Sequence, residues 1–288
     1  YDTITRVRAR PIDTDTLRLA GGVFTTLANR EPSAGGYRAW SRNIRVNRSN
    51  TEVIGLTHNV ACETSEGKPY QGFLNVSGCA NVLLRDCFFT GHRTDSTIGS
   101  AGRPVAMGSY DVSAHGVVGF RMVGCRMNHI LDRTRWGVIA TNHCKNIVLE
   151  GCILSRMDTH MGVSGRYTIR NCTLGHMGLN AIGRGELLVE HSYLYGKSLI
   201  SLRPDYGSTW EGDITIRDCR WTPSGGDPCQ PFVVLARNDG MHDFGYPCSM
   251  PHRIAIEGLH IDDRNHPEDY EWPYLFTDPD ALAECDTP

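Results

Sequence analysis

The sequence predicts an all-β fold, a parallel β-helix, and three observations support this prediction. Residues 146–203 contain three segments that match position for position at a step of 20 residues. Each segment holds two short runs rich in apolar and β-branched residues, separated by Gly, Asn, Asp or Ser, which is typical of strands joined by tight corners. No segment carries a helix-length 3.6-residue pattern. A fixed step of this size indicates one supersecondary unit repeated as a solenoid.

One position of the repeat can be followed along most of the chain. It is occupied, in order, by Leu56, Cys87, Cys125, Cys152, Cys172, Ser192, Cys219 and Leu259. The steps are 20 residues in the centre and grow to 40 toward the ends, so we expect insertions that form loops on one face. An ordinary β-sandwich would account for the strands only through chance similarity between the segments. We interpret the five cysteines as an inward-facing stack of small buried side chains, because metal sites use closer Cys spacings.

The chain shows no division into domains. No Pro/Ser-rich linker or charge block interrupts the 288 residues, so we expect one elongated domain. We predict an irregular N-terminal cap over 1–42, β-helix rungs over 43–262 and an acidic, aromatic C-terminal tail over 263–288. Caps are expected because an open β-helix end exposes unpaired backbone groups.

Charge and hydropathy narrow the function classes. The net charge of −3 gives no electrostatic support for a nucleic-acid partner. No run of 18 apolar residues exists, so membrane insertion is not expected. The motifs GxxxxGK[ST], HExxH and GxSxG are absent. Heptads of a trimerising stalk are also absent, and the oligomeric state stays open.

The cysteines outside the stack bear on the cellular compartment. The total of 11 is odd, and the pairs Cys62–Cys79 and Cys229–Cys248 lie in loop-rich segments where disulfides can form. Such disulfides would indicate an oxidising compartment. The chain opens without an initiator Met or a signal peptide, so we expect a mature or trimmed form that is secreted, periplasmic or at the cell surface.

Several motifs resemble a known superfamily. The segments TNHCKN, MDTHMGV, LGHMGLNAIG and LRPDYGSTW look like those of the right-handed parallel β-helix proteins typified by pectate lyases, and the resemblance covers residues 43–262. That superfamily includes polysaccharide lyases, polygalacturonase-type hydrolases, uronan epimerases and phage tailspikes. The resemblance implies a single-stranded right-handed parallel β-helix that acts on an extracellular polysaccharide. Neither a pectate-lyase calcium site nor a polygalacturonase aspartate cluster can be matched residue by residue. We therefore predict no metal site and no cofactor, with Ca²⁺ implied by analogy alone.

Polar side chains are predicted to stack on two lines of the solenoid. Equal positions of successive rungs lie about 4.8 Å apart. The position eight residues after the Cys stack, extended by the match of WGV with MGV, carries Arg135, His160 and Asn180. The position four residues after the stack carries His129, Arg156 and His176. Two further groups flank these lines, namely Arg203 with Asp205 and Tyr206, and Tyr110 with Asp111 near Trp136.

These residue types suit eliminative cleavage of a uronic-acid polymer. That reaction needs a cation or amide at the carboxylate, a base for the C5 proton and an acid for the leaving oxygen. The candidates for the first task are Arg135, Arg156 and Arg203 with Asn180. The base would be His160 or His176, because His titrates near working pH, and the acid would be Tyr110 or Tyr206. The rings of Trp136, Tyr206 and Trp210 would line the substrate site.

Two alternatives remain open. A glycoside hydrolase would use paired carboxylates, about 5–5.5 Å apart for retention and about 6.5–9.5 Å for inversion, with Asp158, Asp205, Asp111 and Asp132 as candidates. No pair of acids repeats on one line, and Asp158 and Asp205 fit better as groups that orient His160 and Arg203. A non-catalytic glycan-binding or tailspike-like module would instead expose aromatic platforms, for which the candidates are Trp136, Trp210, Tyr206 and Trp221.

Overall fold

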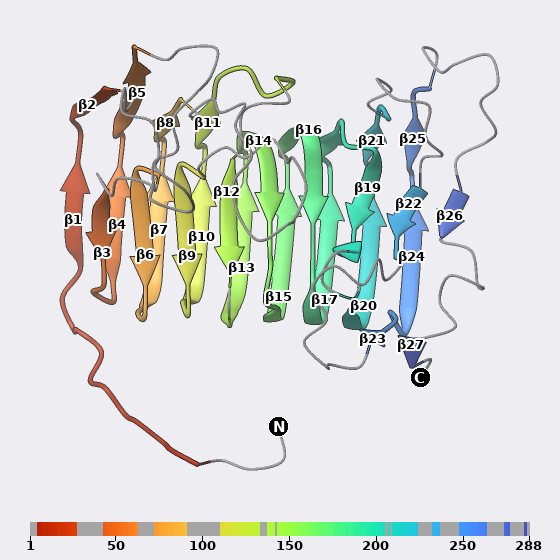
Figure 1. Cartoon of the computed structure of the whole chain (residues 1–288), viewed down its shortest axis with the longest axis horizontal. Coiled ribbons are helices and arrows are strands. Elements are labelled where there is room, and N and C mark those ends of the chain that lie inside the picture. Colours follow the sequence, from red (N-terminus) through yellow and green to blue (C-terminus); the bar gives the residue numbers. More distant parts are fainter. Residues whose placement is uncertain are drawn as a thin grey trace, which may run out of the picture.

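The computed structural model describes residues 5–27, 43–62, 72–90, 110–132, 137–141, 143–204, 207, 209–223, 232–236, 248–263, 274–276 and 285–286. The elements among these residues are β-strands, and every pairing between them is parallel. The strands stack side by side along one axis (Figure 1). The protein is therefore a parallel β-helix, as the repeat predicts.

The coil has three faces, which the chain visits in turn. Face 1 is a nine-stranded sheet made of β1 (Leu17–Ala20), β4 (Thr51–Ile54), β7 (Ala80–Arg85), β10 (Val118–Val123), β13 (Cys144–Glu150), β15 (Val163–Arg170), β17 (Gly183–Glu190), β20 (Trp210–Arg217) and β24 (Arg253–Glu257). Faces 2 and 3 belong to one 16-stranded sheet, because β14 and β16 bend across both of them.

Face 2 comprises β2 (Val23–Leu27), β5 (Thr57–Ala61), β8 (Phe88–Phe89), β11 (Arg126–Met127), the first halves of β14 (Ile153–Asp158) and β16 (Thr173–Asn180), β18 (Tyr193–Leu194), β21 (Arg220–Trp221) and β25 (His260–Ile261). Face 3 comprises β3 (Ile44–Val46), β6 (Leu74–Ser77), β9 (Val112–His115), β12 (Val138–Thr141), the second halves of β14 and β16, β19 (Ser198–Ser201), β22 (Phe232–Leu235) and β26 (Tyr274–Phe276). A separate pair joins β23 (Cys248–Ser249) to β27 (Cys285–Asp286).

The corner between faces 1 and 2 is nearly identical in every rung. Its residue adopts a left-handed backbone, and the column reads Gly55, Asp86, Gly124, Gly151, Asn171, His191, Asp218 and Gly258. Gly, Asn and Asp are the residues that tolerate this conformation best. The corner N–H bonds to the end of the next strand, as from Asn171 to the Glu190 carbonyl at 3.1 Å. The corner thus fixes the turn and the register of each rung together.

The residue after each corner points into the coil. The residues predicted to share one position of the repeat, from Leu56 to Leu259, occupy this position. The residue that follows each of them pairs in register with its equivalent in the next rung, beginning with Thr57 and Phe88 and ending with Arg220 and His260. All five cysteines of the column and Ser192 are buried. The prediction of an inward-facing Cys stack is confirmed.

Alternation along the strands supplies the rest of the core. On face 3, the inward column reads Val112, Val138, Met157, Leu179, Ile200 and Val234, and its members are at most 1% exposed. Period-2 alternation sends the neighbouring side chains outward. Outward positions of face 3 are therefore where this coil can present polar groups.

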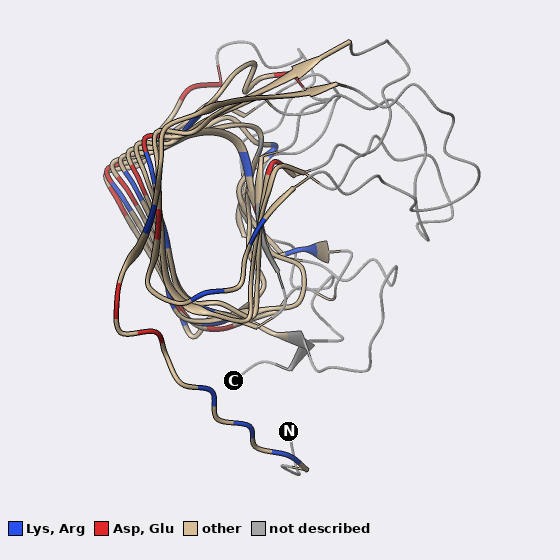
Figure 2. Ribbon diagram, turned by 90° about the vertical axis from the view of Figure 1, so that its left-hand side faces the viewer, with Lys and Arg blue, Asp and Glu red and all other residues tan. Residues whose placement is uncertain are grey.

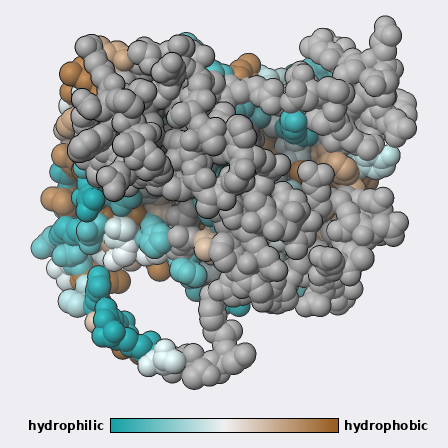
Figure 3. Space-filling view, viewed as in Figure 1, coloured by the Kyte–Doolittle hydropathy of each residue, from teal (hydrophilic) through white to brown (hydrophobic). Residues whose placement is uncertain are grey.

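The parallel ladder extends beyond the predicted limits at both ends. Strands β1 and β2, within the predicted cap 1–42, pair with β4 and β5, and β26, within the predicted tail, pairs with β22. The terminal rung lacks a neighbour among the described strands, so its apolar residues reach the surface, as Figure 3 shows over β1 and β2. Leu17 and Leu19 pair with the buried Thr51 and Val53, yet they are 49% and 36% exposed. This exposure explains why the alternation of buried and exposed residues in the sequence places the first rung at residue 43, after β1 and β2.

Ion pairs bridge successive rungs on the outside of face 1. Figure 2 shows acidic and basic residues alternating along this edge of the coil. Arg170 pairs with Glu190, and Arg217 contacts both Glu190 at 3.7 Å and Glu257 at 3.0 Å. Opposite charges directly across a strand pair favour that register. Each exposed pair is worth less than about 1 kcal/mol, so the ladder specifies alignment more than it adds stability.

The first of the two disulfides that the sequence left open is not formed. Cys62 is exposed, Cys79 is buried, and both are free thiols. The sulfur of Cys79 instead donates to the Val46 carbonyl at 3.8 Å inside the coil. Cys229, and with it the predicted pairing to Cys248, lies outside the described residues. Within the described ranges there is no helix long and apolar enough to cross a membrane.

Candidate functional site

Five of the predicted site residues come together on the outside of face 3. The cluster, called here the Asp158 cluster, consists of Tyr110, Arg156, Asp158, His160 and Arg203. Asp158 ends β14 at an outward position and forms its centre. Tyr110 precedes β9, two rungs toward the N-terminus, while Arg203 follows β19, two rungs toward the C-terminus. Side chains from three rungs, within a span of five, therefore converge on one carboxylate.

Local backbone features make this convergence possible. A Cβ at Gly72 would lie 2.0 Å from the carbonyl oxygen of Tyr110, and one at Gly137 would lie 2.3 Å from that of Arg156. Only glycine allows the backbone to approach so closely at these two points. Arg203 has a φ of 58°, which is uncommon for a residue with a side chain. Its two contacts with Asp158 hold this conformation in place.

Asp158 accepts hydrogen bonds from four side chains. Nη1 of Arg203 lies 2.9 Å from Oδ1 and 3.1 Å from Oδ2, and Nη2 of Arg156 lies 2.9 Å from Oδ2. Nε2 of His160 lies 2.9 Å from Oδ2, and the Tyr110 hydroxyl donates to the same oxygen through a short bond. The Asp158 side chain is fully buried, whereas His160 is 27% exposed. His160 and the partly buried Tyr110 are therefore the groups through which this cluster reaches solvent.

The charges of the cluster keep Asp158 ionised. Burial alone would raise the pKa of this carboxyl, but the guanidinium groups of Arg156 and Arg203, with a smaller contribution from His160, outweigh it. The pKa of Asp158 therefore lies well below its usual value of 3.8. Because arginine stays protonated, two positive charges face one negative charge. The cluster carries a net positive charge even with a neutral His160.

This depressed pKa predicts that acid destabilises the protein. In the unfolded chain Asp158 has a pKa of about 3.9, so just below that pH the unfolded state binds a proton that the folded state does not. The Asp158 contribution to stability is thus complete above about pH 4 and is lost as the pH falls toward the folded-state pKa. Urea denaturation at several pH values below about 4 measures the free energy of unfolding. In Asp158→Asn we expect the slope of this free energy against pH to be smaller than in the unchanged protein, by up to about 1.4 kcal/mol per pH unit. Equal slopes in the two proteins would contradict the account.

Tyr110 is the second group with a clear protonation state. Its burial, outweighing the opposing effect of Arg156, raises the pKa of the phenol well above its usual value of 10, and Asp158 adds to the shift. The phenol therefore keeps its proton at neutral pH. The Arg156 guanidinium lies 5.7 Å from the centre of the Tyr110 ring, and the Tyr110 and His160 rings meet edge to face at 6.3 Å. A protonated phenol and an imidazole thus lie next to each other.

The two predicted lines of polar residues are wrong in detail. The strands β14 and β16 keep the 20-residue step at Leu154 and Leu174, but Arg156 then pairs with Gly178 instead of His176. An irregularity in β16 shifts the register by two residues. Asn180 consequently lies beside Asp158 and not beside His160. His176 lies within the irregular segment, where its N–H donates to the Ile130 carbonyl at 3.0 Å.

The match of WGV with MGV is also misleading. Val138 pairs with Met157 on face 3, whereas Val163 pairs with Cys144 on face 1. The two motifs therefore hold different places in the rung. Arg135, Trp136, Asp205 and Tyr206, which were predicted from this alignment or from the Arg203 segment, lie outside the described residues.

The remaining predicted residues do not join the cluster. Trp210 and Trp221 are fully buried, so the prediction that they form an exposed substrate wall or sugar platforms is wrong. The indole N–H of Trp210 donates to the Asp213 carbonyl at 3.3 Å and that of Trp221 to the Gly196 carbonyl at 2.9 Å. These residues occupy inward positions, which sequence spacing alone did not reveal.

The other predicted acids and His129 have different neighbours. The carboxylate of Asp111, although adjacent in sequence to Tyr110, lies 3.7 Å from the buried imidazole of His58. His129 is an exposed residue with a φ of 52°, and its carbonyl accepts from the Asp132 N–H at 2.8 Å. Neither residue contacts Asp158 in the described structure.

Sequence reasoning missed one residue that positions the cluster. Thr159 lies between Asp158 and His160 and is fully buried. Its hydroxyl donates to the Asn180 carbonyl at 3.3 Å and accepts from the Ile182 N–H at 2.9 Å. The turn that carries His160 is thereby fixed to the next rung. The sequence D-T-H, with a hydroxyl residue between two polar ones, was the available signal.

Among the residues that the structure describes, no group of three or more His, Cys, Asp or Glu side chains could hold a metal ion. The donor set around Asp158 is also unsuited to a cation, because it contains two guanidinium groups. The chemistry available to this cluster is therefore proton transfer and the binding of negative charge.

Comparisons with known proteins give limited similarity. No family model matches the chain. A stretch of 94 residues is 29% identical to a capsule KL64-specific depolymerase of a Klebsiella phage; the match covers 29% of this chain and 9% of that protein. The ORF18 protein of Geobacillus virus E2 can be superimposed over 83% of this chain and 52% of its own, with a TM-score of 0.29 and 12% identity. The chain thus spans only a small part of the depolymerase and about half of the viral protein.

Proposed function

We propose that the protein cleaves an anionic, uronic-acid-containing polysaccharide by β-elimination at the Asp158 cluster. The observation that carries this proposal is the junction of an imidazole, a protonated phenol and two guanidinium groups on one ionised carboxylate. Similarity to a phage protein named as a capsule depolymerase supports a polysaccharide as the substrate.

His160 acts as the base in this proposal. Its Nε2 lies 2.9 Å from Asp158, which is ionised and accepts the Nε2 hydrogen. That bond leaves Nδ1 of the neutral ring with a lone pair. Nδ1 removes the C5 proton of the uronic acid, and Asp158 stabilises the imidazolium that forms.

Tyr110 acts as the acid. The phenol carries its proton at neutral pH because its pKa is raised. As the bond between C4 and the glycosidic oxygen breaks, the phenol protonates that oxygen. The electron pair from the C5–H bond forms the C4=C5 double bond, so no water is consumed. His160 then returns a proton to the phenolate through solvent, and both groups regain their starting states.

Arg156 and Arg203 provide the positive charge that elimination requires. Removal of the C5 proton places negative charge on the sugar carboxylate. Because Arg156 and Arg203 are buried, their positive charges stabilise it across a short distance and not by direct contact. The two guanidinium charges beside Asp158 favour a sugar with a carboxylate over a neutral sugar at this point.

Hydrolysis with paired carboxylates is the weaker candidate. Asp158 is the one carboxylate in the cluster, and its depressed pKa prevents it from donating a proton as a general acid. Its complete burial beneath four partners also disfavours attack on a sugar carbon. A non-catalytic, tailspike-like recognition module remains the alternative from a different class, and it requires binding without cleavage.

We further propose that the coil belongs with the pectate-lyase-like right-handed β-helices. The three-faced rung and the motifs quoted above support this assignment. Because the proposed substrate is an extracellular polymer, we place the protein in a secreted, periplasmic or cell-surface location. The free thiols of Cys62 and Cys79 give no support for an oxidising compartment.

The experiment that tests this function is incubation with a panel of uronic-acid polysaccharides, including acidic bacterial capsule polymers, while absorbance near 235 nm is followed. We expect a rise on at least one polymer, because the product carries a double bond conjugated to its carboxylate. New reducing ends without the absorbance rise would indicate hydrolysis. Binding without either signal would indicate recognition alone.

A further inference from the structure

A second groove lies at the corner between faces 1 and 2, away from the Asp158 cluster on face 3. It has a volume of about 710 Å³ and is lined by residues of four successive rungs, from Asn171 in the first to His260 in the last. A smaller hollow of about 340 Å³ shares Arg220 and His260 with it. The two hollows form one trough along the axis of the coil. At about 4.8 Å per rung, four rungs span roughly 14 Å.

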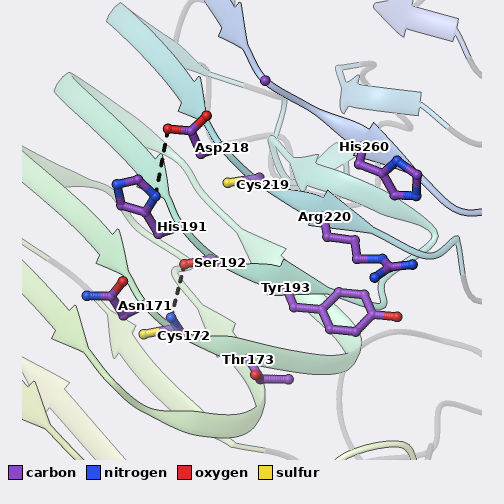
Figure 4. A pocket seen from close by; sticks show the side chains of 11 residues that line it. Asn171, Cys172, Thr173, His191, Ser192, Tyr193, Asp218, Cys219, Arg220 and His260 are labelled. Atoms are coloured by element: carbon purple, nitrogen blue, oxygen red, sulfur yellow. Dashed lines mark hydrogen bonds and ion pairs between the residues drawn. The ribbon is translucent and has the colours of Figure 1, made fainter.

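The repeat itself creates this trough. Corner residues such as His191 and Asp218 project on one side, and the first outward residues of face 2, including Tyr193 and Arg220, project on the other. Between these two lines lie Ser192 and Cys219, which point inward and are small. Figure 4 shows the two lines of side chains with Ser192 and Cys219 between them. The small side chains of Ser192 and Cys219 therefore leave the trough open between its two walls.

The walls present planar hydrogen-bonding groups and aromatic rings. Nδ1 of His191 lies 3.7 Å from the Asp218 carboxylate on one wall. On the other wall the Arg220 guanidinium lies 5.7 Å from the centre of the Tyr193 ring, which packs against Tyr195 at 4.3 Å. His191, Asp218 and Arg220 are 51%, 57% and 51% exposed. These groups are thus accessible to a ligand without rearrangement of the coil.

Carboxylates outnumber guanidinium groups in the trough, unlike in the Asp158 cluster. Arg220 lies 3.3 Å from Asp262, and Asp218 faces His191. The lining of the two hollows thus contains one guanidinium, three carboxylates, counting Asp263, and two imidazoles, counting His260. This set offers donors and acceptors for hydroxyl groups but no surplus positive charge for an anion. Aromatic rings beside such groups suit the apolar faces of a sugar.

We propose that this trough is a second glycan-binding site, which holds a neutral, hydroxyl-rich segment of the polysaccharide outside the reaction site. The proposal rests on the proposed function for its choice of a glycan over other linear polar ligands. Because the corner between faces 1 and 2 lies opposite face 3, the trough and the Asp158 cluster bind different segments of a polymer. Simultaneous engagement of two segments raises the effective concentration of substrate at the reaction site.

The test is affinity electrophoresis of the full chain in gels that contain one polymer each: a neutral glucan, a galactan, a mannan, polygalacturonate or alginate. We expect retardation by at least one neutral polymer. Arg220→Ala and Tyr193→Ala should each weaken this retardation roughly tenfold or more, since hydrogen bonds to charged groups and aromatic contacts are worth about 1–3 kcal/mol. Arg126→Ala is the matched control, because Arg126 is exposed at the equivalent position two rungs before the trough.

Several results would overturn this proposal. The first is that no neutral polymer retards the protein. The second is that Arg220→Ala and Tyr193→Ala reduce the retardation no more than Arg126→Ala does. The third is that the two variants lose retardation only by the two uronic polymers. Thermal melting of each variant shows whether it is folded. If Tyr193→Ala does not fold, Arg220→Ala alone tests the site, because Arg220 is exposed. Binding needs no turnover, so an absorbance assay at 235 nm reports separately on the reaction. Trough binding without that absorbance would retain this site and reject elimination.

Discussion

Replacing Asp158 by alanine is expected to lower the free energy of unfolding by about 3–5 kcal/mol, because it removes the buried carboxylate that two buried guanidinium groups share. The side chains of Arg156 and Arg203 are only 5% and 8% exposed, so water cannot solvate their charges after the substitution. The variant also loses the acceptor of the Tyr110 and His160 hydrogen bonds. Urea denaturation at pH 7 measures the change.

Asp218→Asn is the matched control for this stability experiment, because asparagine tolerates the left-handed backbone of this corner, where φ is 48°. Asp218 also faces a histidine, but its side chain is 57% exposed and lies 3.7 Å from its partner. Exposed ion pairs contribute about 0–1 kcal/mol, so the control should stay within that range. A loss at Asp158 no larger than the loss at Asp218 would show that the cluster is not a tightly packed charge network.

The second large effect is expected on catalysis. His160→Ala removes the proposed base and should lower kcat on the cleaved polysaccharide by about 10²–10⁴-fold, the usual contribution of a positioned proton-transfer group. Tyr110→Phe removes the proposed acid while keeping the ring against Arg156, and a loss in the same range is expected. Steady-state rates at 235 nm measure both.

His115→Ala controls for the loss of an imidazole from face 3. His115 ends β9 and is exposed, without a place in the Asp158 cluster. Its variant should keep the rate within about twofold. Activity that survives in both His160→Ala and Tyr110→Phe would exclude these residues as base and acid, even if the protein proves to be a lyase.

The fold was readable from the sequence because one small residue type marks each turn of the coil. Cys87, Cys125, Cys152, Cys172 and Cys219 occupy the same inward place in their rungs, with Leu56 and Leu259 at the two ends of the column. The regular corner residue before each of them fixes the register. The ends of the ladder were misjudged because terminal rungs lack a neighbour on one side. Leu17 and Leu19 are consequently exposed although they occupy inward positions of their strand.

The site was readable only in part. Residues close in sequence to Asp158, such as Arg156 and His160, were found because they sit on the regular strands. The exact alignment failed where β16 adds two residues between Leu174 and Gly178, since a fixed step cannot foresee a local irregularity. The left-handed Arg203 and the shared carboxylate of Asp158 are tertiary features with no local sequence signal.

The buried tryptophans show a complementary limit. Trp210 and Trp221 follow polar, loop-like sequence, which suggested surface positions. Each indole N–H instead finds a backbone carbonyl inside the structure, which removes the cost of burying it. Aromatic residues of a solenoid can be assigned to the core or the surface only once the register of their rung is known.

The central claim is that this β-helix breaks a glycosidic linkage by elimination. Its most direct test is the ratio of unsaturated ends, from absorbance at 235 nm, to new reducing ends in the same digest of a uronic-acid polysaccharide. The account predicts one unsaturated end for each new reducing end, with both signals lost together in His160→Ala. New reducing ends that accumulate with no absorbance at 235 nm would contradict it.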